Sequence, residues 1–463
     1  MRLTTSLASA SLVALISAAA LADPSATAGS ATDAASAPAT KPKDLLGDMV
    51  VVASSARALP KIGVVPSLSA ELEDVTLRSV VRRDLDLCGE LEVLAESDAP
   101  EGLYLSDSPV DTKAWSKKGA EAVVRVSAKK SGDRVELTGQ AYLVKVGPTP
   151  VLEKTTTLAM ADLRTGAHRM ADALIGALTG HKGAFASRLT FASGTGKIRR
   201  VYVVDADGIG ARAVSPEDET ALAPAFGKDH EVLYAASANS AEYKIRSETG
   251  KDQPLPVRGS VYGIAFDKAG GKVAVSVGAG ASIRLLSGPD FAHLTPATEV
   301  PFALEPTFTP GGKLAFVGLS GNSQRVYVGE KPVTPEGAFA MSPTFCNHPD
   351  GIRLVFAAGA LLQTDLFSTG ESGGALVRLT QDQGKNSSPA CSPDGRLVAF
   401  FSTRTTGEGP GLYVMRTDGL RPKRISSLLG DSLRWDALPP EPAPASTDAS
   451  KMTAPAAPAA AGK

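Results

Sequence analysis

The sequence has few of the residues that cross-links and metal sites require. It contains three cysteines and five histidines in 463 residues, and none of them stands at the spacing of a metal site. Cys346 and Cys391 lie in short apolar segments, where cysteine acts mostly as a small hydrophobic residue. We expect these two and Cys88 to be free thiols, since three is an odd and small number for a disulfide framework. We expect no metal and no cofactor, and we expect His168 to be a hydrogen-bonded core residue.

The chain also lacks a charge imbalance and the signatures of common enzymes. Its formal net charge is −1, which does not favour binding to nucleic acid or to an anionic membrane. No Gly-x-Ser-x-Gly segment occurs, so the nucleophile turn of the α/β-hydrolases is missing. Residues 194–197 differ from a phosphate-binding loop, because Phe191 and Ile198 stand where that motif requires glycine and Ser or Thr. The sequence therefore predicts no catalytic residue and no enzyme activity.

The sequence has a single long apolar run, at its start. Residues 1–22 contain a basic residue, an apolar stretch and small residues ending at Ala22, as secretory signal peptides do. This stretch is too short to span a membrane stably. We expect an exported protein, cleaved near Ala22, without a membrane span or a lipid anchor.

Two segments have few large apolar residues, and we expect neither to fold. Residues 23–46 and 439–463 are rich in Ala, Ser, Thr and Pro. Such segments bury too little apolar surface to offset the entropy of ordering the chain. They are predicted to be a flexible leader and a disordered tail.

Residues 47–183 have the pattern of a compact domain that mixes helices and strands. Runs of β-branched residues predict strands, and Ser69 and Gly89 are placed to cap the two ends of a helix. The clearest helix has one continuous apolar stripe and is followed by Gly180, a typical C-terminal cap. Strands are expected at residues 49–53, 62–65, 91–94, 122–128 and 135–146, and helices at residues 69–89, 113–118 and 163–178.

Residues 184–438 repeat one strand, turn and strand pattern, most clearly at residues 387–402. There, the turn Pro393-Asp-Gly precedes a continuous apolar run. Similar segments recur with steps of 40, 42, 37 and 46 residues, and such a period is typical of a β-propeller. Trp435 begins a further unit that lacks its later strands, whereas strands at 189–192 and 201–204 lack a first strand. We therefore predict an α+β N-terminal domain followed by an all-β propeller of six blades, closed by pairing these ends. The recurring first-strand residues are Phe226, Phe266, Phe308, Phe345 and Cys391.

Several segments resemble the TolB family of the Tol–Pal system. Residues 163–189 are the most specific, because Leu163-Arg, Ala167-His and Lys182-Gly match the junction between the two domains of that family. Residues 60–66, 80–89 and 114–124 resemble its first strand, first helix and Trp-containing strand approach. The resemblance covers residues 47–438. The chain departs from it at Trp435-Asp-Ala, where the family usually has Trp-Ser-Pro.

The resemblance implies a monomeric periplasmic scaffold that links two partners. In the family, the propeller face binds the outer-membrane lipoprotein Pal, and a strand before the first domain engages the inner-membrane protein TolA. This assembly supports envelope integrity and outer-membrane constriction in cell division. The implied contacts are Met49, Val50, Val51 and Val52 for a TolA-like protein, and Ser260 and Glu305 for a Pal-like lipoprotein.

Two other functions remain open on the residues alone. A propeller can bind a small ligand or a peptidoglycan fragment, which requires a deep central pocket with convergent polar groups. A peptidase-related enzyme requires a nucleophile paired with a base.

Overall fold

The computed structural model describes residues 58–440 except 103, 105–107, 196–197, 239–241, 268–270, 361–362 and 382. The predicted signal peptide and leader, and the predicted strand that contains Met49, Val50, Val51 and Val52, lie outside the described residues, as does nearly all of the predicted tail. No helix among the described residues has the length and apolar character needed to cross a membrane.

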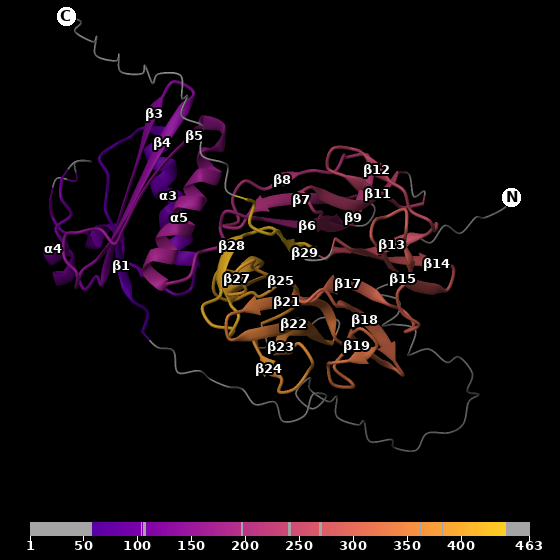
Figure 1. Ribbon diagram of the computed structural model, residues 1–463. Helices are drawn as coiled ribbons and strands as arrows, with labels where there is room; N and C mark the ends of the chain where they lie inside the picture. Colours follow the sequence, from indigo (N-terminus) through magenta and orange to yellow (C-terminus); the bar gives the residue numbers. More distant parts are fainter. Residues whose placement is uncertain are drawn as a thin grey trace, which may run out of the picture.

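The N-terminal part is one five-stranded sheet with its two long helices on a single face (Figure 1). The strand order is β2-β1-β3-β4-β5, and β1 pairs in parallel with both β2 and β3. The long helices α3 and α5 lie between this sheet and the propeller (Figure 1). The elements are β1 (Lys61–Val64), α3 (Leu72–Leu87), β2 (Glu92–Val93), α4 (Thr112–Lys117), β3 (Ala122–Ser131), β4 (Arg134–Leu143), β5 (Leu152–Ala159) and α5 (Leu163–Thr179), with short 3-10 turns at Glu96–Asp98 and Met160–Asp162.

Most of the expected elements of this part are confirmed, with two corrections. Helix α5 ends at Gly180, whose φ of 82° is left-handed, as the sequence predicts. Ser69 does not cap α3, because the helix begins at Leu72 and its N-cap is Glu71, which makes no side-chain capping bond. Strand β5 was not expected from the sequence, since it is a half-exposed edge strand composed mostly of Glu, Lys and Thr.

The rest of the described chain forms six four-stranded sheets, which we number as blades 1 to 6 (Figure 1). In each blade the first strand lies nearest the central axis. Blade 1 comprises β9 (Glu219–Phe226), β10 (Val232–Ala238), β11 (Lys244–Ser247) and β12 (Asp252–Gln253); blade 2 comprises β13 (Ser260–Phe266), β14 (Val273–Ala279), β15 (Ser282–Gly288) and β16 (Thr295–Pro296); blade 3 comprises β17 (Leu304–Phe308), β18 (Leu314–Ser320), β19 (Ser323–Val328) and β20 (Lys331–Pro332). Blade 4 comprises β21 (Met341–His348), β22 (Gly351–Ala360), β23 (Gln363–Gly370) and β24 (Val377–Arg378); blade 5 comprises β25 (Asn386–Cys391), β26 (Leu397–Ser402), β27 (Gly411–Arg416) and β28 (Lys423–Ser426); blade 6 comprises β29 (Asp431–Trp435), β6 (Arg188–Thr195), β7 (Ile198–Asp205) and β8 (Arg212–Ala213).

Blade 6 joins the two ends of the propeller, as the sequence predicts. Its inner strand β29 pairs antiparallel with β6, so that Trp435 lies opposite Leu189. The buried indole of Trp435 donates a hydrogen bond of 2.8 Å to the hydroxyl of Ser187, just before β6. A ring closed in this way leaves no open sheet edge at the seam.

The expectation of three free thiols is wrong, because Cys346 and Cys391 form a disulfide. Both residues lie near the ends of inner strands, β21 and β25, in neighbouring blades. Their Cα atoms are 5.2 Å apart although 45 residues separate them in sequence. The odd cysteine is Cys88, which is buried and free, and burial raises the pKa of its thiol to about 12.

Candidate partner-binding face and interdomain cluster

Each inner strand of the propeller is bulged shortly after it begins. The pairing with the second strand shifts register there in all six blades. In five blades the bulge holds a non-glycine residue with φ between 48° and 54°, and Gly263 has the equivalent place in blade 2. Such bulges bend a strand and redirect its side chains. The five residues are Ala223, Glu305, Ser342, Ser388 and Ser432.

Four of these residues connect neighbouring blades, in two pairs. The backbone N–H of Ser342 donates to Glu305 Oε2 at 2.6 Å, and the Ser342 hydroxyl donates to Oε1 at 3.2 Å. In the same way the N–H of Ser432 donates to the hydroxyl oxygen of Ser388 at 3.1 Å. Glu305 therefore holds blade 3 against blade 4, a role that the sequence did not predict. Ser260 is the first residue of β13 in the adjacent blade and is half-buried.

Replacing Glu305 tests this interblade role. Glu305→Ala removes both acceptors and leaves the N–H of Ser342 without a partner, which should cost about 1–3 kcal/mol of unfolding free energy. Glu305→Gln keeps one carbonyl oxygen in place and should cost less. Urea unfolding of the two variants measures the difference, and equal losses would contradict the assignment.

The side of the propeller where the inner strands begin, which we call face 1, carries exposed apolar residues. The loops into the inner strands and the hairpins between second and third strands both open on this face, because successive strands of a blade are antiparallel. Ile198 is 73% exposed, Phe339 44% and Leu429 41%. Apolar side chains exposed on one face can contribute to a protein-binding site, whose centre is usually apolar.

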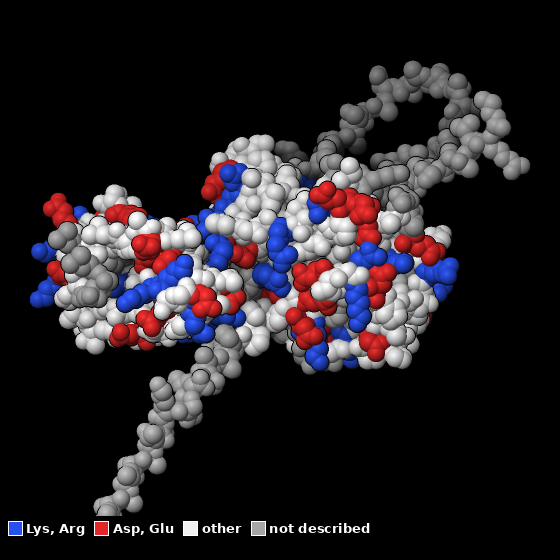
Figure 2. All heavy atoms as spheres, turned by 90° about the horizontal axis from the view of Figure 1, so that it is seen from above, with Lys and Arg blue, Asp and Glu red and all other residues white. Residues whose placement is uncertain are grey.

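The opposite side, face 2, is where the N-terminal part docks. Lys423 lies 2.5 Å from the carboxylate of Asp86 on α3, and Arg396 pairs with Glu90. Both residues belong to blade 5. Figure 2 shows the two parts in contact, with positive and negative side chains interspersed on the surface in view and no large patch of one sign. In the part of the chain that the structure describes, the N-terminal sheet and helices leave face 1 free.

A central cavity of about 380 Å³ lies toward face 2 and is lined by inner strands of all six blades. Its polar lining includes Thr307, Thr344, Asn347 and Arg434. A pocket with convergent polar groups is the feature that a ligand-binding propeller requires.

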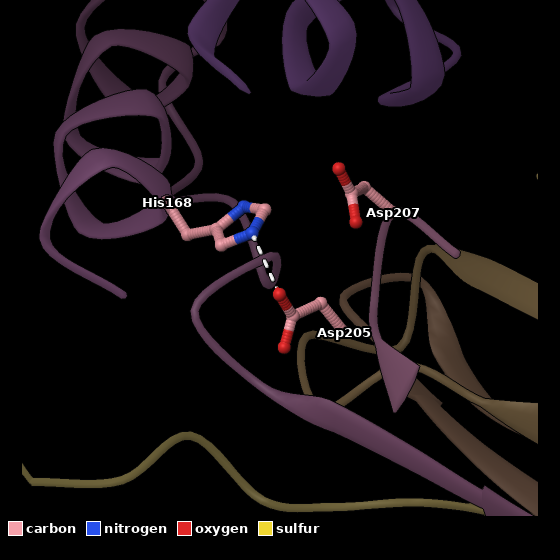
Figure 3. Close-up of side chains that lie close together, drawn as sticks. All are labelled: His168, Asp205 and Asp207. Carbon is pink, nitrogen blue, oxygen red and sulfur yellow. Dashed lines mark ion pairs between the residues drawn. The ribbon is translucent and has the colours of Figure 1, made fainter. Parts of the chain in front are cut away.

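A buried group of charged residues joins α3 and α5 to blade 6. His168 Nδ1 lies 2.6 Å from Asp84 Oδ2. On its other side, Nε2 lies 3.8 Å from Asp205 Oδ2 (Figure 3). Arg164 is 2.5 Å from the carboxylates of both Asp205 and Asp207. The ion pairs of Arg164 and His168 with Asp205 and Asp207 cross from α5 to the end of β7 and the loop after it, so they help to fix the N-terminal part on the propeller. We call Asp84, Arg164, His168, Asp205 and Asp207 the interdomain cluster.

A second arginine, Arg83, lies beside the interdomain cluster and bonds to the propeller backbone. Arg83 donates to the backbone oxygens of Asp207, at 2.7 Å, and of Ile425, at 3.0 Å. Burial lowers the pKa of His168, but the carboxylates of Asp84, Asp205 and Asp207 outweigh it, so that the pKa rises to about 10. Burial raises the pKa of Asp84, and His168 opposes that rise. His168 is therefore protonated at neutral pH.

The interdomain cluster contains three groups that could bind a metal ion. One ligand atom from each of His168, Asp205 and Asp207 lies within 4.8 Å of the others (Figure 3). Arg164 and protonated His168 already supply the positive charge that a cation would bring to these carboxylates. We therefore interpret the cluster as an ion-pair network between domains. The expected buried, hydrogen-bonded role of His168 is confirmed, but Asp205 and Asp207 were missed.

Comparison with known proteins relates the chain to one family. Residues 48–147 match the family model of the TolB amino-terminal domain. The Tol-Pal system protein TolB of Methylococcus capsulatus is 32% identical over 196 residues, 42% of this chain and 46% of that protein. Tol-Pal system protein TolB 1 of Novosphingobium aromaticivorans is 30% identical over 169 residues, 35% of this chain and 37% of that protein. The matched region spans less than half the length of each relative.

The fold also agrees with that of a solved TolB structure. TolB from Acinetobacter baumannii superposes with a TM-score of 0.67 at 21% identity, covering 82% of this chain and 97% of that chain. The predicted combination of an α+β part and a six-bladed propeller is thus confirmed. Residues 48–147 are thus similar to the TolB amino-terminal domain, and the described chain has the fold of a solved TolB.

Proposed function

We propose that the protein is a periplasmic TolB-type scaffold of a Tol–Pal system and binds a protein partner on face 1. The observation that supports this most is the set of exposed apolar side chains on face 1, since the described N-terminal elements occupy the opposite side. The curated relatives are named as Tol-Pal system proteins and not as enzymes, and the proposal assigns no catalytic role. We assign residues 47–183 to the N-terminal domain and residues 184–438 to the propeller.

The periplasm is the compartment that fits the covalent chemistry of the chain. The disulfide between Cys346 and Cys391 suits an oxidising environment, where such bonds persist. The signal-like pattern of residues 1–22 would direct the chain there.

Two partners follow from the family resemblance. A Pal-like lipoprotein would contact face 1 near Ser260 and Glu305. A TolA-like protein would engage the strand that contains Met49, Val50 and Val51, by adding it to the edge of a sheet. A scaffold that holds both would link outer and inner membranes and support envelope integrity during division.

Face 1 binding is tested by charge substitution with a matched control. Phe339→Asp should weaken binding of the organism's Pal-type lipoprotein domain at least about tenfold. Removing an apolar contact at the centre of an interface costs about 1–2 kcal/mol of binding free energy, and about 1.4 kcal/mol corresponds to a tenfold change in the dissociation constant. The fold should tolerate this change, because Phe339 has a φ of 45°, which aspartate adopts more readily. Ile209→Asp is the control, since Ile209 is also 44% exposed but lies in the loop after β7, on face 2.

Calorimetry with the purified mature protein gives the affinities, and circular dichroism confirms that both variants are folded. Equal affinity for the wild type and Phe339→Asp would exclude Phe339 from the binding site. Absence of any Pal-type lipoprotein binding by the wild type would overturn the proposed function.

A further inference from the structure

The central cavity contains one charged residue that the fold does not explain. Arg434, on the inner strand of blade 6, lies opposite Thr190 in the second strand. The equivalent inner-strand residues of the other blades are Ala225, Ala265, Thr307, Thr344 and Ala390, as their register with the second strands shows. Five blades thus place a small residue where blade 6 places an arginine.

The guanidinium of Arg434 has little within the protein to neutralise it. Its one hydrogen bond among the described residues is a long one, 3.4 Å from Nη1 to the backbone oxygen of Leu433. It forms no ion pair with any described carboxylate. Glu305 is the acidic group that acts on it, and both oxygens of Glu305 already accept hydrogen bonds from Ser342. Burial lowers the pKa of Arg434, and the charge of Glu305 opposes that change.

The other polar side chains that line the cavity are neutral hydrogen-bonding groups, except that of Asp267. Thr307, Thr344 and Asn347 line the same cavity, and a hydroxyl or an amide can donate to an anion beside the arginine. The cavity, at about 380 Å³, has room for a small organic group. A planar guanidinium binds a carboxylate through two parallel hydrogen bonds. A single positive charge matches a monocarboxylate better than it matches a phosphate dianion.

We propose that the central cavity of the propeller is a carboxylate-binding site in which Arg434 supplies the charged contact. The carboxylate belongs either to a free small molecule or to a protein that docks over the cavity. The site does not depend on the identity of the face 1 partner, so it can be tested without one.

The first test uses propionate and its neutral isostere propionamide on the mature protein, at constant ionic strength. Ligand-observed NMR should show saturation transfer to propionate and not to propionamide. Arg434→Met should weaken propionate binding at least about tenfold, a loss typical of a removed charge-assisted hydrogen bond. Arg434→Lys keeps the positive charge but cannot form two parallel hydrogen bonds to a carboxylate. Its affinity for propionate should therefore lie between that of the wild type and that of Arg434→Met. Arg421→Met, an exposed arginine in the loop after β27, is the control and should bind like the wild type.

The second test asks whether the carboxylate comes from a protein. If propionate does not bind, an acetylated tetra-alanine peptide with a free C-terminal carboxylate should still bind, and its amidated form should not. Arg434→Met should weaken binding of the carboxylate peptide at least about threefold, while Arg421→Met should not. Propionate binding that is lost in Arg434→Met identifies a free carboxylate as ligand. If neither propionate nor the carboxylate peptide binds, or if Arg434→Met changes the binding of neither, the carboxylate site is refuted, and the proposed function of face 1 is unaffected.

Discussion

Replacing His168 with glutamine should lower the free energy of unfolding by about 3–5 kcal/mol at pH 7, the usual cost of removing one partner from a buried ion pair. His168 is 3% exposed and is the cation that the buried Asp84 faces at 2.6 Å. Glutamine can donate a hydrogen bond to Asp84 but carries no charge. The loss should appear both in urea unfolding and in earlier proteolysis near the interdomain connection, residues 180–187.

The same residue makes stability depend on pH in a defined direction. The pKa of His168 rises from 6.5 to about 10 on folding, so the folded protein binds the proton more tightly than the unfolded chain. This contribution is fully present below about pH 6.5 and is lost as the pH rises through about 10. Wild-type stability should therefore decline between these values, and His168→Gln should decline much less.

Two choices isolate the effect of His168. Burial also raises the pKa of Asp84 to about 7 and that of Asp172 to about 6, so measurements between pH 8 and 10 avoid most of their titration. His181→Gln is the matched control, because His181 is exposed at the end of α5. A His168→Gln variant with the same pH dependence as the wild type would refute protonation of His168 in the folded state.

Breaking the disulfide between Cys346 and Cys391 should cost about 4 kcal/mol, the loop-closure entropy of a link that spans 45 residues. The bond joins the inner strands of blades 4 and 5, so its loss should destabilise the propeller in particular. The variant Cys346→Ala with Cys391→Ala measures this without reductant. Unfolding can be followed by the emission of Trp435 if Trp115 is replaced by phenylalanine, since the chain has two tryptophans.

Thiol titration provides an independent check on the disulfide. The denatured, unreduced protein should react with one equivalent of thiol reagent, from Cys88, and with three equivalents after reduction. Cys88→Ala is the control, because it removes the free thiol and leaves the interblade bond intact. Three equivalents without reduction would show that the propeller closes without a disulfide.

The parts of the fold that depend on local chemistry were predictable from the sequence. The apolar stripe and Gly180 determine where α5 lies and ends. The turns such as Pro393-Asp-Gly and the period near forty residues determine the blades. The missing strands at each end determine that blade 6 pairs β29 with β6. In each case the structure depends on residues within about one turn or one hairpin of each other, or on residues that recur at a constant spacing. Both kinds of pattern can be read directly from the amino-acid sequence.

The features that join distant segments were decided by the tertiary structure alone. The sequence does not show that Cys346 and Cys391 meet, because the approach of two inner strands depends on the radius of a closed ring. Among the described residues, the hydrogen bonds of the Glu305 side chain all go to Ser342 of the next blade, and they exist because the bulges of neighbouring blades lie side by side.

The interdomain cluster shows the same limit at longer range. Asp84, His168 and Asp205 come from two helices and the end of a blade strand, and each alone looks like an ordinary polar residue of its element. Their roles follow from burial. A buried charge without a partner destabilises the folded protein, whereas buried charges of opposite sign interact strongly with each other. Local patterns in the sequence determined which elements form and how the ring closes. Only the docking of these elements decided which charges are buried together, since that depends on distances through space that no spacing in the chain records.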